Sequence, residues 1–254
     1  MTHARKSVAA AALFLACAPH PPAKRPAADV VPGAAPSPAF AAPIRPDDAD
    51  GFLQPNAEDV DGAPMYVHYT EADMPLRVDV QLPKLAARYA SREETDAAVI
   101  EAIRSWETAI QRVLPWFRLE IVRGVHDADI AVEWKTRISG AAGWGGVDWS
   151  VDHGRLRVRG RLEYATKPCI AIECQLDLPH LKLLVTHEFG HTLGLGHCLD
   201  CDSAMNYSWE TLERVLITDV DVRTIQALYS LPNGTRTDGT LSFALRPGAE
   251  RRPP

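Results

Sequence analysis

Along the middle of the chain, apolar and polar residues either alternate or recur at helical spacing. Residues 76–82 alternate strictly, which predicts a half-buried strand. A helix is expected next, because Ser91 and Glu94 have the spacing of a capping box and Pro115 interrupts the pattern. Its apolar positions follow spacings of four and three and form one face, namely Val99, Ile103, Trp106, Ile110 and Val113. This helix is therefore expected to lie on a sheet.

The same patterns predict further strands and two later helices. Residues 117–122 and 128–134 have strand-like composition, and residues 217–229 have the spacing of an amphipathic helix. Another helix is expected before residue 194, with a buried stripe that recurs every four residues: Leu181, Val185, Phe189 and Leu193.

Composition separates the ends of the chain from this patterned region. Residues 18–46 hold nine of the 20 prolines among many alanines, which favours an extended linker over a packed core. Residues 47–64 are acidic and are expected to continue the linker or to form a short pro-segment. One ordered domain is expected over residues 65–232, and the tail of residues 233–254 is expected to be irregular.

The N-terminus has the pattern of an export signal. Arg5 and Lys6 precede an apolar run over residues 8–16 that is too short for a permanent membrane helix. Residues 15–17 resemble a bacterial lipobox, which implies that Cys17 carries a lipid and becomes the mature N-terminus. We therefore expect an exported protein, either a cell-envelope lipoprotein or a freely secreted or periplasmic protein. The net charge of -6 indicates no nucleic-acid partner, and we expect a monomer.

One short sequence motif, residues 187–197, here called the zinc string, contains the candidate catalytic and metal-binding residues. His187 and His191 lie four residues apart, so on a helix both side chains project from one face and can bind a single zinc ion. Glu188 can deprotonate a water at that ion and so act as general base. Gly194 permits a left-handed turn that ends the helix, after which His197 supplies a third ligand and one position stays open. The alternative is an ordinary helix whose histidines lie in a core or on the surface.

The spacing of this string, together with Met205 and Tyr207, resembles that of the metzincin metalloproteases. The resemblance implies that Met205 forms the apolar floor of the site. It also implies that Tyr207 coordinates zinc or donates to the oxyanion, as in the astacin-like and serralysin-like branches; the alternative is an ordinary packed tyrosine. The rest of the domain looks matrixin-like. The implied fold is α+β, with a twisted mixed sheet, a long backing helix, an active-site helix and a C-terminal helix.

Two segments before the zinc string have alternative interpretations. Residues 143–149 lie where the family has the sheet edge that lines the cleft, but they also suit a glycine-rich hairpin with two packed tryptophans. Residues 155–162 place four arginines on one strand face, which suits acidic substrates or, more simply, a solvated sheet face.

The domain's four cysteines favour two disulfides, as in other exported proteins, in a pairing that the sequence leaves open: Cys169, Cys174, Cys198 and Cys201. The alternative is a second, structural zinc held by four thiolates, which the position of Cys198 directly after a zinc histidine also suggests through a resemblance to archaemetzincins. Neither a second zinc nor a calcium ion is favoured. No cysteine lies between residues 17 and 169, so a cysteine-switch propeptide is absent from this sequence.

These observations predict a zinc-dependent endopeptidase that hydrolyses peptide bonds in proteins or peptides. In this hypothesis His187, His191 and His197 hold one catalytic Zn²⁺, Glu188 activates the water and Tyr207 assists the oxyanion. One alternative is a catalytically silent, zinc-stabilised peptide-binding module of the cell envelope. Another is a lipid-anchored envelope factor in which zinc only supports the structure.

Overall fold

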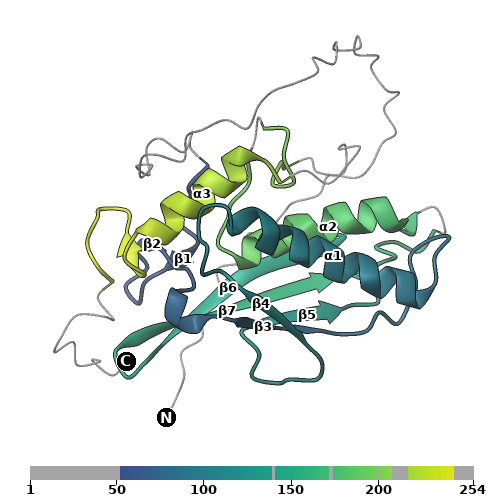
Figure 1. The fold of residues 1–254 in the computed structure, drawn as a ribbon, viewed down its shortest axis with the longest axis horizontal. Helices are drawn as coiled ribbons and strands as arrows, with labels where there is room; N and C mark the ends of the chain where they lie inside the picture. Colours follow the sequence, from purple (N-terminus) through teal and green to yellow (C-terminus); the bar gives the residue numbers. More distant parts are fainter. Residues whose placement is uncertain (1–51, 139–140, 172–173, 199–200, 208–216, 243–254) are drawn as a thin grey trace, which may run out of the picture.

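The computed structural model describes residues 52–138, 141–171, 174–198, 201–207 and 217–242 (Figure 1). The expected export signal, Cys17, the proline-rich linker and residues 243–254 lie outside these described residues. No helix in the described part of the chain is long and apolar enough to cross a membrane.

A five-stranded mixed sheet forms the centre of the fold, in the order β4-β3-β5-β7-β6. Its first four strands are parallel, and β6 runs antiparallel to β7 at one edge. The strands are β3 (Leu76–Val80), β4 (Leu119–Val122), β5 (Ile130–Trp134), β6 (Gly143–Asp152) and β7 (Arg155–Tyr164). Side chains alternate across β3 and β5 between a fully buried face and a partly exposed face, as the sequence pattern predicts.

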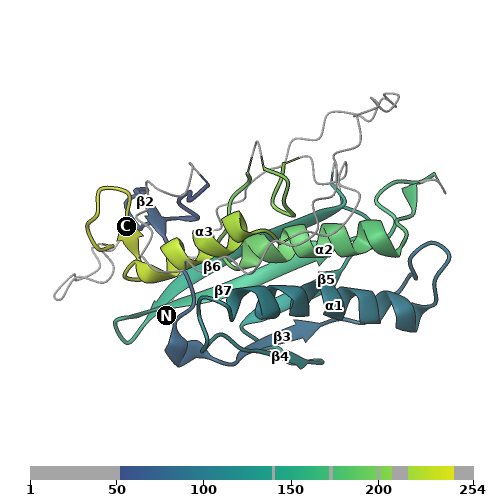
Figure 2. The same cartoon turned by 45° about the horizontal axis from the view of Figure 1, so that its top comes forward.

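The helices α1 (Arg92–Ile110) and α2 (Leu178–Thr192) lie side by side on one face of this sheet (Figures 1 and 2). The predicted capping box begins α1, since the Ser91 hydroxyl accepts from the N–H of Glu94 and the Glu94 carboxylate accepts from the N–H of Ser91. Trp106 of α1 is fully buried and its indole N–H donates to the carbonyl of Thr186 in α2, at 2.8 Å. The backing helix is thus tied to the helix that carries the histidines.

The third helix, α3 (Asp219–Ser230), has Thr218 as its N-cap and buries its apolar side, as the helical spacing over residues 217–229 predicts. The α+β fold, with a mixed sheet, a long backing helix, the zinc-string helix and a C-terminal helix, is confirmed. Two elements are shorter than the sequence predicts. Strand β3 ends at Val80, with Leu82 exposed, and α1 ends at Ile110, before Val113.

A second, three-stranded sheet includes residues on both sides of the expected domain, residues 65–232. It consists of β1 (Ala57–Glu58), β2 (Pro64–Tyr66) and β8 (Thr235–Arg236), in the order β1-β2-β8. Residues of the expected linker, in β1, and of the expected irregular tail, in β8, therefore each pair with β2 and form part of this sheet.

The acidity of the N-terminal segment has a structural explanation. Asp59 is fully buried and accepts from the Nε of Arg236, at 2.8 Å, and from the hydroxyl of Ser242, at 2.7 Å. A carboxylate that looked like a solvated linker residue is half of a buried ion pair, and sequence alone does not reveal its distant partner.

The arginine-rich strand β7 presents its charges on the face of the sheet opposite the helices. Three of its arginines form ion pairs there with Asp73, Glu133 or Glu163, namely Arg155, Arg157 and Arg161. This arrangement fits the simpler prediction of a solvated sheet face.

The cysteines form two local disulfides, Cys169–Cys174 and Cys198–Cys201. The predicted disulfides are confirmed, and the structure selects the pairing that the sequence left open. The alternative four-thiolate zinc site is wrong, because all four sulfurs are used in these bonds.

Candidate metal centre

Helix α2 places two histidines at the base of a buried site. Asp177 caps the helix by accepting from the N–H of His180, and a proline occupies its first turn. From Leu183 onwards every residue of α2 is buried, including His187 at 2% and His191 at 8% exposure. The histidines therefore project into the protein, and their ordinary surface interpretation is excluded.

A sharp reversal then brings the third histidine back to the other two. Leu193 is the C-cap of α2, and Gly194 follows with a φ of 98°, which a residue without a side chain adopts at low cost. The N–H of Leu195 donates to the carbonyl of Gly190, which closes the turn. His197 consequently approaches from outside the helix, as the spacing of the string predicts.

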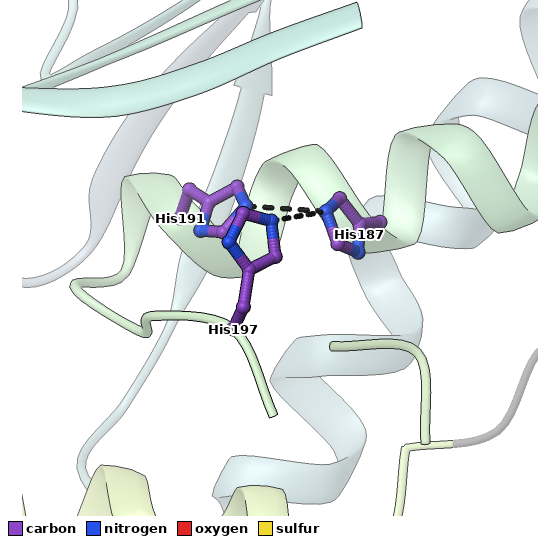
Figure 3. A group of neighbouring side chains, drawn as sticks. All are labelled: His187, His191 and His197. Carbon is purple, nitrogen blue, oxygen red and sulfur yellow. Dashed lines mark hydrogen bonds between the residues drawn. The ribbon is translucent and has the colours of Figure 1, made fainter. Parts of the chain in front are cut away.

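The three imidazole rings converge on one point (Figure 3). Nε2 of His187 lies 3.2 Å from Nε2 of His191 and 3.2 Å from Nε2 of His197. The other ring nitrogens of the helical pair face backbone carbonyls: Nδ1 of His187 lies 2.7 Å from the oxygen of Ala204, and Nδ1 of His191 lies 2.7 Å from that of Leu195. A carbonyl only accepts, so both Nδ1 atoms carry protons and both Nε2 atoms present lone pairs.

Facing lone pairs at this distance repel unless they share a cation. A proton is a poor candidate, because burial holds the pKa of His187 well below its usual value and lowers that of His191 to about 4. Zinc bound to imidazole at about 2.0–2.1 Å in tetrahedral geometry separates the nitrogens by roughly 3.3 Å. The donor type, the spacing and the orientation of the lone pairs therefore fit zinc. Among the described residues, this is the one group of histidine, cysteine or acidic side chains placed to hold a metal.

Glu188 lies beneath the edge strand β6. Its side chain is buried, and burial raises its pKa to about 8 although the N–H of Gly145 opposes the shift. The strand approaches so closely that a Cβ on Gly145 would collide with the backbone of Glu188. A nearby divalent cation favours the ionised carboxylate, so bound metal would oppose the effect of burial.

Met205 and Tyr207 follow the third histidine in the next turn of the chain. Met205 is fully buried, and its sulfur packs directly on Gly190, between the two helical histidines. Tyr207 is 45% exposed and its ring lies 5.1 Å from that of His197, nearly perpendicular to it. The structure therefore brings both predicted residues to the site, and Tyr207 is not an interior packing residue.

Sequence reasoning missed the groups that orient the ligands. The carbonyls of Ala204 and Leu195 hold two imidazoles, and the N–H of Gly145 meets the candidate base. Backbone groups have no signature in a residue pattern, although the glycines of β6 hinted at a close approach. The Cys198–Cys201 disulfide also lies in the loop after the third ligand.

A buried helix with two histidines, a reversing turn to a third and a methionine packed beneath them define a metzincin-type zinc domain. A sequence profile described as matrixin matches residues 77–230, and the chain belongs to this family. It is also 29% identical over 146 residues to human matrix metalloproteinase-15, a match that covers 54% of this chain and 22% of the human protein. Matrixins use zinc, and the three histidines of this chain are placed so that they could bind such a metal ion.

Proposed function

We propose that this protein is a zinc-dependent endopeptidase that cleaves proteins or peptides. The observation that carries the proposal is that the buried carboxyl group of Glu188 lies on the same helix as His187 and His191, on which His197 converges from the following loop. A purely structural zinc is usually enclosed by four protein ligands, whereas the described residues provide a set of three, which would leave a position for water. Membership of the matrixin family supports the same conclusion.

The edge strand β6 is suited to holding the substrate. It pairs with β7 on one side and ends the order of the described sheet, so its other edge has backbone groups for an extended peptide. Recognition through the backbone would align a scissile bond with little dependence on its side chains. The contact between Gly145 and Glu188 links this strand directly to the candidate base.

Zinc, when bound, polarises the scissile carbonyl and acidifies water at its open position. Glu188 accepts the proton of the attacking water and returns it to the leaving amine. In this proposal Tyr207, whose partly exposed ring lies beside that of His197, donates its phenolic O–H to the developing oxyanion. His187, His191 and His197 serve as the zinc ligands, and they take no part in the transfer of protons to or from the substrate.

The test compares the zinc-loaded full chain with its Glu188→Gln variant on casein and on a library of quenched peptides. Loss of the base is expected to lower the rate by at least about 100-fold, while the zinc content stays at one ion per chain. A chelator should abolish the wild-type activity and added zinc should restore it. Equal rates for the two proteins would contradict the proposal, and binding of peptides without cleavage would support a silent peptide-binding module instead.

The protein's location is part of the same proposal. Disulfides are typical of exported proteins, and two are present in the domain. A lipid at Cys17 lies outside the described residues and stays a prediction.

A further inference from the structure

Residues 52–56, here called the strap, lie against the loop that carries the third zinc histidine. The strap precedes β1, far from that loop in sequence, and it lies outside residues 77–230, which match the family. Its first residue, Phe52, is 2% exposed and packs in the main core. The strap is therefore anchored to the domain, and its polar side chains face the turn after α2.

Asn56 is the central contact of the strap. Its amide oxygen accepts from the N–H of Val67 and its amide nitrogen donates to the carbonyl of Val67, both at 2.8 Å. The same nitrogen also lies 3.3 Å from the carbonyl oxygen of Gly194, the residue that reverses the chain after the zinc helix. One side chain thus connects Val67, the residue directly after β2, to the start of the histidine loop.

Gln54 contacts the other end of the same loop. Its amide nitrogen donates to the carbonyl of His197 at 3.4 Å, and its side chain fills the space where a Cβ on Gly196 would lie. Gln54 is itself exposed, so this contact adds little to the stability of the core. Its importance lies in its contact with His197, the third candidate ligand.

The loop between these two contacts controls two of the three ligands. It carries His197, and its Leu195 carbonyl orients His191 through Nδ1, at 2.7 Å. Groups that orient metal-bound imidazoles typically change metal affinity by 10- to 100-fold when they are lost. A displacement of the loop would therefore weaken zinc binding without removing any ligand.

We propose that Asn56 and Gln54 are positioning residues of the zinc centre and that the strap is a functional part of that centre. The inference rests on the proposed zinc site and extends it to a segment outside the matched family region. By fixing the carbonyls of Gly194 and His197, the strap holds the loop in the conformation in which His191 and His197 face His187.

A matched control exists beside the three-stranded sheet β1-β2-β8, here called the accessory sheet. The amide of Asn233 clamps His68 as that of Asn56 clamps Val67, accepting from its N–H at 3.1 Å and donating to its carbonyl at 2.7 Å. In the described part of the chain, the side-chain hydrogen bonds of Asn233 go to His68 and none goes to the histidine loop. Asn233→Ala therefore reproduces the loss of a side-chain clamp without the loss of a loop contact.

The experiment measures zinc affinity of the full chain by competition with a chromogenic chelator, for the wild type and for Asn56→Ala, Gln54→Ala and Asn233→Ala. We expect Asn56→Ala to raise the dissociation constant about tenfold and Gln54→Ala about threefold, with Asn233→Ala within twofold of the wild type. The visible spectrum of the cobalt-substituted protein should change in the first two variants and not in the third. Circular dichroism establishes that each protein is folded, and Gln54→Ala alters an exposed side chain, so it remains testable if Asn56→Ala fails to fold.

Zinc affinities of both strap variants within twofold of the wild type would overturn the inference while leaving the zinc site intact. An equal loss of affinity in Asn233→Ala would also overturn it, because the effect would then come from the stability of the accessory sheet. Failure of the wild type to bind zinc would overturn the proposed function as well.

Discussion

Replacement of Asp221 is expected to destabilise the turn beneath the zinc site. Asp221 is fully buried at the start of α3, and its carboxylate accepts from the hydroxyl of Ser203 at 2.8 Å and from the N–H and hydroxyl of Thr218 at 2.6 and 2.9 Å. Ser203 in turn accepts from the N–H of Met205, at 3.0 Å. The carboxylate therefore connects the cap of α3 to the methionine turn, whose Ala204 carbonyl orients a zinc ligand.

The magnitude follows from these bonds. Loss of the capping interaction costs about 1 kcal/mol. Leaving the hydroxyl of Ser203 buried without its acceptor costs a further 1–3 kcal/mol or so. Burial raises the pKa of Asp221 against its hydrogen bonds, so part of their energy already offsets desolvation. We therefore expect Asp221→Ala to reduce the free energy of unfolding by about 3 kcal/mol.

Urea unfolding of the zinc-loaded protein, followed by circular dichroism, measures this loss, which corresponds to a fall in Tm of roughly 10 °C for a domain of this size. Asp221→Asn retains one acceptor oxygen and should lose about half as much. Ser203→Ala should lose about 2 kcal/mol, because it removes both the bond to Asp221 and the bond from the N–H of Met205. A loss below about 1 kcal/mol in Asp221→Ala would refute the reasoning, since the carboxylate would then contribute no more than a surface cap.

Two further predictions concern the cleft and the pH dependence of stability. Gly145→Ala should lower kcat/KM by at least about tenfold, because the added Cβ would collide with the backbone of Glu188. Gly146→Ala is the control, because its Cβ would meet the ring of Trp144 instead. Similar values of kcat/KM for the two variants would argue against a close contact between β6 and α2. The metal-free protein should lose stability as the pH falls from 6.5 towards about 4, because the unfolded chain binds a proton there that buried His191 does not. Glu188, whose pKa burial raises to about 8, contributes a slope of the opposite sign, so the test uses the Glu188→Gln variant, which lacks this carboxyl. In that variant the slope should be about 1.4 kcal/mol per pH unit for His191, and a free energy of unfolding that is flat between pH 7.5 and 5 would contradict the prediction.

Short-range sequence patterns predicted those parts of the site that depend on residues close together in the sequence. The spacing of His187 and His191 follows from helix periodicity, and the role of Gly194 follows from its lack of a side chain. The cap at Ser91 and the start of α3 at Thr218 are likewise short-range hydrogen-bond patterns. Each of these interactions lies within one or two turns of chain, so its residues identify it without knowledge of the fold.

Tertiary structure alone decided the contacts between distant segments. Residues of the expected linker and tail pair with β2 in a folded sheet, and an ion pair joins Asp59 to Arg236. The side chain of Asn56 contacts the carbonyl of Gly194, which is distant in the sequence. The carbonyls that orient two of the zinc ligands belong to the backbone, which every residue shares. The sequence therefore determined which residues were suited to bind zinc, whereas long-range packing determined what holds them in place. Contacts between distant segments depend on proximity in space, so they produce no regular residue spacing that the sequence could reveal.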